Sequence, residues 1–351
     1  MNKEPWRIAV LGAGGWGTTL GILLGENGHL VTLWEYFPEQ AERLLREHEN
    51  RKFLPGVAIP ESISITSDLG AALSRARLVL FAVPSHTVRE TARALVASGA
   101  VDPSAIVVNA SKGIEEDTLL RMSEVLADEL PVDLHRICTI AGPSHAEEVS
   151  RQMPTSVVVA GVNEGTIETV QHIFFRPYFR VYTNPDLVGV ELGVALKNCI
   201  AIAAGVCDGL GYGDNTKAAL VTRGLAEIAR LGVAMGARRD TFAGLAGVGD
   251  LVVTCLSRHS RNRYVGEKIG QGLKLEEVLA GMVMVAEGVR TTRAAVALGR
   301  RYHVELPITE GVHHILFEDG DPREAINQLM TRPLRQELQG SGDRMKQGGS
   351  P

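Results

Sequence analysis

The chain has 351 residues, 45% of them hydrophobic and 22% charged, with a formal net charge of −5. Chains longer than about 250–300 residues usually divide into more than one hydrophobic core, so we expect two domains. The composition excludes a disordered or fibrous protein, and a mildly acidic chain without a long basic run argues against nucleic acid as the principal partner.

An uncharged stretch covers residues 8–25, which is close to the length of a membrane span. Six of its residues are glycine, and no signal-peptide cleavage pattern follows it. A buried strand that turns into a buried helix explains the stretch better, so we expect no transmembrane segment.

Short β-rich runs alternate with helix-like segments over the first 185 residues or so. Several runs are continuously apolar, as in strands covered on both faces of a parallel sheet. Helix-like segments include residues 18–25, 39–49, 87–97 and 118–130. The alternation predicts an α/β fold with a doubly wound sheet. The predicted strands are residues 7–11, 30–34, 63–66, 78–83, 106–109, 137–141, 156–159 and 179–182.

This rhythm breaks at the sequence T-N-P-D, residues 183–186, after which helix-like segments dominate. We therefore expect a sheet domain over residues 1–185 and a helical domain over 186–338. Residues 339–351 are rich in Gly, Ser and charge and predict a disordered tail. The predicted helices of the second domain are residues 187–206, 216–236, 275–280, 291–302, 309–318 and 322–329.

A glycine-rich motif, G-A-G-G-W-G at residues 12–17, follows the first strand and opens a helix. In this context Gly12 permits a tight turn, Gly14 lets backbone approach a pyrophosphate, and Gly17 lets helix and strand pack closely. The anion would lie against unpaired N–H groups at the helix N-terminus. The motif predicts a dinucleotide site, the alternative being a purely structural turn.

The second strand ends at Glu35, 23 positions after Gly12. An acid there can accept hydrogen bonds from a ribose 2′-hydroxyl and repel a 2′-phosphate, which favours NAD over NADP. The alternative is a carboxylate that points into solvent. Tyr36 and Phe37 either flank an adenine or are ordinary aromatic residues.

Later strands end in polar residues at the edge where open α/β sheets bind ligands. Lys112, in S-K-G, would bring a cation to this edge unless it is an ordinary surface lysine. His86 and His145 follow two other strands, and we interpret both mainly as capping or packing residues.

The apolar run 188–206 contains Lys197, which shares a helical face with Gly189 and Gly193. We expect Lys197 to project over a glycine-lined groove, where a lowered pKa suits a general base. The alternative is a lysine that reaches solvent at a helix edge. Asn198 would orient substrate or pair with Glu191.

Further polar motifs lie downstream. Residues 246–250 form a glycine-rich turn that presents Asp250. Residues 257–263 hold three arginines around Asn262, either a phosphate-binding cluster or a solvated basic loop. Glu287 would reach a cofactor or cap the helix that follows. The four cysteines show no paired spacing, which is typical of a cytoplasmic protein and argues against a disulfide scaffold or a metal site.

Taken together, these motifs resemble those of bacterial NAD(P)-dependent glycerol-3-phosphate dehydrogenases over about residues 7–335. They are G-A-G-G-W-G at 12–17, V-P-S-H at 83–86, S-K-G at 111–113, A-G-P-S-H-A-E-E at 141–148, N-P-D at 184–186, E-L-G-V-A-L-K-N at 191–198, G-V-G-D-L at 247–251, S-R-N-R at 260–263 and A-E-G at 286–288.

The resemblance implies an N-terminal Rossmann domain, a helical C-terminal domain of the 6-phosphogluconate-dehydrogenase type, and the reversible oxidation of sn-glycerol 3-phosphate to dihydroxyacetone phosphate, which supplies phospholipid synthesis. It implies Lys197 as the proton acceptor. The substrate-binding positions it implies are Lys112, Gly142, Ser144, Asp250, Ser260, Arg261 and Asn262. The cofactor-binding positions are Gly12, Gly14, Gly15, Trp16, Gly17, Glu35, Tyr36, Lys112, Ala146, Arg261, Val285 and Glu287.

Two positions depart from the pattern that the resemblance implies. Position 15 is Gly where the family often has Ser, and positions 35–36 are Glu-Tyr where NADP-preferring relatives tend to carry basic or imidazole side chains. NAD is therefore favoured, although both cofactors stay open. Other possibilities are a related dehydrogenase acting on 6-phosphogluconate, a hydroxyacid or ketopantoate, or a catalytically silent dinucleotide sensor. Apolar helical residues 225–233 favour a homodimer.

Overall fold

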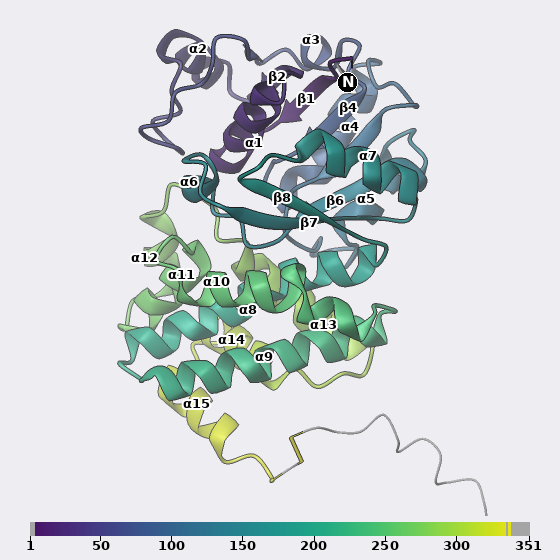
Figure 1. The fold of residues 1–351 in the computed structure, drawn as a ribbon. Helices are drawn as coiled ribbons and strands as arrows, with labels where there is room; N and C mark the ends of the chain where they lie inside the picture. Colours follow the sequence, from purple (N-terminus) through teal and green to yellow (C-terminus); the bar gives the residue numbers. More distant parts are fainter. Residues whose placement is uncertain (1–3, 335, 338–351) are drawn as a thin grey trace, which may run out of the picture.

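The computed structural model describes residues 4–334 and 336–337. An eight-stranded sheet with flanking helices forms one half of the molecule, and an all-helical half lies beneath it (Figure 1). All eight predicted strands are present, with ends that shift by up to two residues. They are β1 (Arg7–Leu11), β2 (Leu30–Trp34), β3 (Ser64–Thr66), β4 (Leu78–Phe81), β5 (Ile106–Asn109), β6 (Ile137–Ala141), β7 (Thr155–Gly161) and β8 (Phe179–Asn184).

The strand order is β3-β2-β1-β4-β5-β6-β7-β8, and the first six strands are parallel in the order of a Rossmann sheet. β7 pairs antiparallel with β6, and β8 runs parallel to β7. The predicted doubly wound sheet is confirmed, with one antiparallel pair, β6 and β7. The link from β6 to β7 carries only the four-residue helix α6 (Ala146–Val149), which is too short for the usual parallel crossover.

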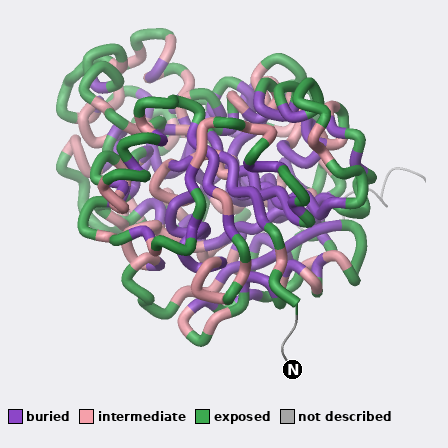
Figure 2. Tube along the Cα trace, turned by 90° about the horizontal axis from the view of Figure 1, so that it is seen from above, coloured by how far each residue is buried: buried purple, intermediate pink, exposed green. Residues whose placement is uncertain are grey.

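Helices cover both faces of the sheet, so β1, β4, β5 and β6 are buried almost throughout. In the view from above, buried segments gather in the interior and exposed ones lie on the outer turns (Figure 2). The short α3 and α6, and α7, were not predicted. The helices are α1 (Gly15–Glu26), α2 (Pro38–Glu47), α3 (Leu69–Leu73), α4 (Val88–Ala97), α5 (Met122–Glu129), α6 and α7 (Glu164–Phe174).

The uncharged stretch at residues 8–25 is β1 followed by α1, as predicted. Among the described residues, the one helix long and apolar enough to cross a membrane is α8 (Leu187–Gly209), and 89% of its most apolar 18-residue window is buried within the protein. Its place at the centre of the helical half accounts for that composition.

α8 begins directly after β8 ends the sheet, and α9, α10, α11, α13 and α14 pack against it. The sequence does not predict α10 and α11, because their residues have the composition of a glycine-rich turn and a basic loop. The short segments η3 (Arg239–Ala243) and η4 (Leu245–Gly249) lead into α10. The helices are α9 (Asp214–Ala234), α10 (Asp250–Leu256), α11 (Arg261–Gly270), α12 (Leu275–Ala280), α13 (Glu287–Arg301), α14 (Pro307–Phe317) and α15 (Pro322–Met330). The predicted tail, residues 339–351, lies outside the described residues.

Glycine lets α8 and α11 cross at backbone contact. A Cβ atom at Gly205 would lie 1.9 Å from the Arg263 carbonyl oxygen, and one at Gly266 would lie 1.9 Å from the Ile202 carbonyl oxygen. Since no side chain fits at either position, this crossing fixes where the N-terminus of α11 lies relative to the middle of α8.

Candidate active site

The glycine-rich turn has the geometry that its spacing predicts. Gly12 has φ +101° and donates its N–H to the Trp34 carbonyl at 3.0 Å. A Cβ at Gly17 would lie 1.9 Å from the Gly12 carbonyl oxygen, so helix and turn pack without a side chain. A Cβ at Gly14 would meet no atom within 4 Å. The turn is therefore closely packed at Gly12 and Gly17, and the space beside Gly14 is open.

Position 15 has a local reason to be glycine in this chain. A Cβ there would lie 2.8 Å from the Phe53 carbonyl oxygen and 3.8 Å from the Cβ of Ala146, which places Ala146 beside the turn. The Trp16 ring packs at 6.5 Å from the Phe179 ring, and its buried Nε1 has no hydrogen-bond partner within the described part of the chain.

Glu35 lies at the carboxyl end of β2 and is buried, so the alternative of a solvent-facing carboxylate is wrong. Burial raises the pKa of Glu35, while hydrogen bonds from the backbone of Phe37 and Ala13 and the charge of Lys52 partly offset that rise. Tyr36 is 69% exposed, and its ring meets the Phe37 ring edge-on at 5.0 Å.

Lys112, following β5, brings its ammonium group to the end of β6. Its Nζ donates to the Gly142 carbonyl at 3.0 Å and to Asp250 Oδ2 at 2.9 Å. The Ser144 hydroxyl donates to the same Gly142 carbonyl at 3.0 Å. Two hydrogen bonds therefore hold the Lys112 ammonium group at the carboxyl-terminal edge of the sheet, and the alternative of an ordinary surface lysine is wrong.

The two histidines have different surroundings. Burial and the charges of Lys197 and Lys112 lower the pKa of His145, whose ring lies 5.8 Å from that of His259. The pKa of His86 is lowered by burial and by Arg290. His145 therefore lies near the lysine pair, whereas the charges around His86 come from α13, α4 and residue 116.

Lys197 projects from the middle of α8, only 4% exposed. Its Nζ donates to Asp250 Oδ1 at 2.5 Å and to the Thr254 hydroxyl. Burial lowers the pKa of Lys197 to about 7; the Asp250 charge works against this shift and the Lys112 charge adds to it. Burial alone would raise the pKa of Asp250, but its two ammonium neighbours bring it below its usual range. Two lysines thus share one carboxylate.

The predicted glycine groove beside Lys197 is wrong. A Cβ at Gly193 would lie 2.4 Å from the Ala246 carbonyl oxygen, and one at Gly189 would lie 2.2 Å from Asp186 Oδ2. These glycines admit the chain of η3 and η4 against α8, and that contact brings Asp250 to Lys197. Thr254 was missed; its signal is a position one helical turn after Asp250, on the same face of α10.

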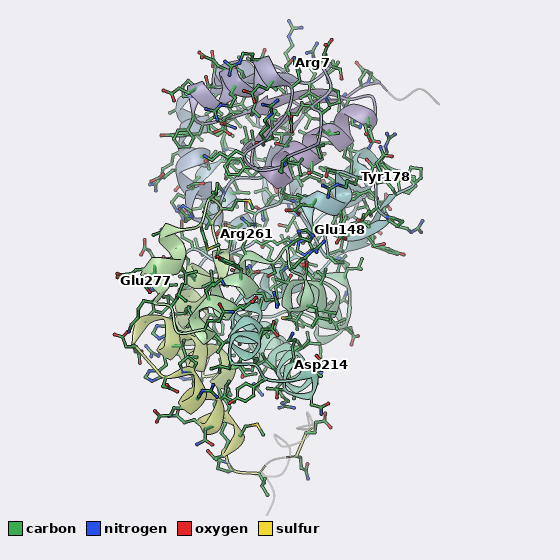
Figure 3. All side chains as sticks on the ribbon, turned by 90° about the vertical axis from the view of Figure 1, so that its left-hand side faces the viewer. Arg7, Glu148, Tyr178, Asp214, Arg261 and Glu277 are labelled. Carbon is green, nitrogen blue, oxygen red and sulfur yellow. The ribbon has the colours of Figure 1, made fainter. Side chains whose placement is uncertain are left out.

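Ser260 begins α11 by accepting the Arg263 N–H at 3.2 Å. Arg261 is exposed at the first helical position, at the level where the two halves meet (Figure 3). Arg263 pairs instead with Asp208 and Glu267, so the three arginines do not form one cluster.

Asn262 and Asn198 pair with each other. Asn262 Nδ2 donates to Asn198 Oδ1 at 2.9 Å, and Asn262 Oδ1 accepts the Gly288 N–H at 2.9 Å. The predicted Asn198–Glu191 pair is therefore wrong. Next to Gly288, Glu287 accepts the N–H of Ser85 at 3.0 Å and also its hydroxyl. Val285 is partly exposed just before this contact.

The residues fit a dinucleotide. Gly14 is open to solvent, the first N–H groups of α1 have no partner within their own helix, and a carboxylate ends β2 on the same side. Lys112 follows the end of β5, and Asp250 joins it to Lys197 of α8.

Comparison with known proteins adds an independent result. The family model described as the NAD-dependent glycerol-3-phosphate dehydrogenase N-terminus matches residues 7–167, and the model described as the C-terminus matches residues 186–327. A glycerol-3-phosphate dehydrogenase [NAD(P)+] of Pelotomaculum thermopropionicum is 54% identical over 334 residues, covering 95% of each chain.

Two further relatives agree with this match. A protein of the same name from Desulfitobacterium hafniense is 52% identical, covering 95% of this chain and 93% of its own. The crystal structure of glycerol-3-phosphate dehydrogenase from Coxiella burnetii superposes with a TM-score of 0.89 at 37% identity, covering 93% of this chain and 99% of that one. The chain belongs to the family of NAD-dependent glycerol-3-phosphate dehydrogenases.

Proposed function

We propose that this protein interconverts sn-glycerol 3-phosphate and dihydroxyacetone phosphate with NAD or NADP. The observation that carries the proposal is the buried Lys197, whose amine has a pKa of about 7 and lies between Asp250 and Thr254. Such an amine can accept and return a proton at neutral pH.

The chemistry has two parts. The bound nicotinamide supplies a hydride acceptor for C2 in oxidation and a hydride donor in reduction. Lys197 takes the C2 hydroxyl proton as oxidation proceeds and returns it in reduction. Asp250 holds the Lys197 amine in place, and the Lys112 ammonium group stabilises negative charge that develops on the C2 oxygen.

Substrate and cofactor contacts come from the remaining predicted residues. Gly12, Gly14, Gly15, Trp16 and Gly17 would hold the pyrophosphate, and Glu35 and Tyr36 the adenosine end. Arg261, which is exposed and not engaged by the carboxylates that hold Arg263, would bind the substrate phosphate with Ser260 and Asn262 at its sides. Gly142 and Ser144 would complete the substrate site, and Ala146, Val285 and Glu287 the cofactor site.

The test is the loss of NADH absorbance on adding dihydroxyacetone phosphate to the purified chain. We expect turnover with this substrate and none with ketopantoate; 6-phosphogluconate, tested in the oxidative direction with NAD or NADP, should form no reduced cofactor. Lys197→Met should abolish turnover and leave NADH binding intact. A chain that binds NADH and reduces no triose phosphate would contradict the proposal. A lower KM for NADH than for NADPH would support the role of Glu35.

The cellular setting is part of the same proposal. We place the protein in the cytoplasm, where its product would supply phospholipid synthesis, and divide it into domains at residues 1–185 and 186–338. We further propose a homodimer, which the exposed Val233 near the end of α9 supports. Light scattering of the purified protein measures the oligomeric state directly.

A further inference from the structure

A turn at residues 50–56, N-R-K-F-L-P-G, packs against the glycine-rich turn from another part of the chain. Its first residue, Asn50, is 0% exposed. Asn50 Nδ2 donates to the Ala13 carbonyl at 2.7 Å and to the Thr18 hydroxyl at 2.8 Å, and Oδ1 accepts the Phe53 N–H at 3.3 Å. Both ends of the amide are engaged, so its orientation is fixed.

The contact with Ala13 determines where the next N–H group points. No described peptide bond is cis, so the Ala13 carbonyl and the Gly14 N–H point in opposite directions from one peptide plane. By holding the carbonyl on its own side, Asn50 turns the Gly14 N–H away from itself. The position above Gly14 is open, which is where an anion can approach.

The same turn also closes over position 15. The Leu54 N–H donates to the Asn50 carbonyl at 2.7 Å, which shapes the turn so that the Phe53 carbonyl faces Gly15. A serine at position 15 would therefore meet this carbonyl at its Cβ. In this chain the Phe53 carbonyl, held by the turn that begins at Asn50, therefore occupies the space that a serine side chain at position 15 would need.

We propose that Asn50 is a positioning residue for the cofactor: it orients the Ala13–Gly14 peptide so that the Gly14 N–H binds the dinucleotide pyrophosphate. The proposal rests on the proposed function only in requiring a dinucleotide at this turn. Asn50 itself is 0% exposed and would act only through this peptide. A charged phosphate strengthens the hydrogen bond that this orientation provides.

The experiment measures binding of ADP-ribose, which contains the pyrophosphate and takes no part in hydride transfer, by isothermal titration calorimetry. Asn50→Asp keeps the shape but replaces the donor with an acceptor beside the Ala13 carbonyl. We expect the Kd to rise about tenfold or more. The KM for dihydroxyacetone phosphate and kcat at saturating NADH should stay within about twofold.

Thr18→Val is the matched control, because it removes the other acceptor of Asn50 Nδ2 and leaves the Ala13 contact intact. Its Kd for ADP-ribose should match that of the unaltered protein. If Asn50 had only a structural role, Asn50→Asp and Thr18→Val should both lower the melting temperature, and neither should selectively weaken ADP-ribose binding. Should Asn50→Asp not fold, Asn50→Ser, whose shorter side chain withdraws from Ala13, carries the same expectation.

The outcomes separate the two proposals. Unchanged ADP-ribose affinity in a folded Asn50 variant overturns the role of Asn50. Equal loss of affinity in Thr18→Val also overturns it. Tight ADP-ribose binding by the unaltered protein without reduction of dihydroxyacetone phosphate overturns the proposed function instead.

Discussion

Lys197 shows how one buried amine can be prepared for proton transfer. Desolvation disfavours its ammonium form, whereas the carboxylate of Asp250 favours that form and Lys112 opposes it. Because one carboxylate is shared by two lysines, it cannot fully compensate both. The pKa of Lys197 therefore falls to about 7 instead of staying near 10.5.

The first prediction is a pH dependence with opposite signs in the two directions. Oxidation needs the neutral amine, so kcat should rise with pH and level off above about 7. Reduction needs the ammonium form, so its kcat should fall across the same range. Asp250→Asn removes the charge that favours the ammonium form and should shift both midpoints to lower pH. Stopped-flow rates of hydride transfer measure this; a midpoint near 10 would contradict it.

Glu227 on α9 is a second group with a shifted pKa, and it should make the free energy of unfolding depend on pH. This buried carboxyl accepts the N–H groups of Ile308 and Thr309 at the start of α14, yet burial raises its pKa to about 7. A carboxyl with a raised pKa in the folded state stabilises the fold below its unfolded pKa of about 4.5, and this stabilisation is lost as pH rises to about 7.

The second prediction therefore concerns Glu227→Gln, which cannot ionise. Relative to this variant, the unaltered protein should lose roughly 1–3 kcal/mol of unfolding free energy between about pH 5 and pH 7.5. Urea denaturation at the two pH values tests it. Parallel pH dependence in both proteins would assign the titration to other groups.

Among single residues, the sequence identifies functional candidates where a polar or charged side chain stands among apolar neighbours. Lys197 stands out in an apolar run, and Lys112 at a strand end. Thr254 and Asn50 carry no such contrast: one is a hydroxyl within an apolar helix, the other a polar residue in a polar loop. Only the folded chain shows that Lys197 and Ala13 are their partners.

Among the elements, the crossing of α8 and α11 matters most for the site. Gly205 and Gly266 let the helices meet at their backbones, so that α11 begins against the face of α8 that carries Asn198, the neighbour of Lys197 in the chain. The strands were predictable because continuous apolar runs give a direct signal. α11 was not, because its glycines and arginines are typical of loops, and its helical state depends on packing against α8.

The third prediction tests this crossing. Gly205→Ala should lower the unfolding free energy by about 1–3 kcal/mol and raise the substrate KM, because a Cβ 1.9 Å from the Arg263 carbonyl must push α11 outward. Gly311→Ala is the control: it lies within α14 with no atom within 4 Å of its Cβ, so it should stabilise by about 0.5–1 kcal/mol. Equal effects of the two changes would refute the packing argument.

Across the whole molecule, several polar contacts between described residues join the halves. Lys112 pairs with Asp250, Ser85 bonds Glu287, and Glu116 pairs with Arg290 and Arg293 of α13. The buried Glu191 of α8 makes the largest set of contacts with the sheet half. Glu191 accepts Arg121 Nη1 at 2.6 Å and the Ser123 hydroxyl at 2.6 Å. It also accepts the Ser123 N–H at 2.9 Å and the Thr139 hydroxyl at 3.0 Å. The carboxylate thus fixes α8, and with it Lys197, against the sheet.

The fourth prediction follows from that network. Glu191→Gln removes one of the two carboxylates that pair with Arg121, leaving the more exposed Glu124, and should cost about 1–3 kcal/mol. We expect kcat to fall more than the affinity for NADH, because most of the proposed cofactor residues lie in the sheet half. Adding Arg121→Met should restore part of the stability, and the double-mutant cycle measures this coupling. Additive losses would show that the pair is not coupled.

The apolar composition of α8 has a consequence during synthesis. Helices that cover it, including α11, α13 and α14, all follow it in the chain, and the last of these ends at Phe317. At roughly 5–20 residues per second, a ribosome makes that cover several seconds after α8 has emerged. During that interval α8, which is as apolar as a membrane-spanning helix, has not yet been covered by these helices. The nascent chain should therefore depend on chaperones that bind apolar helices.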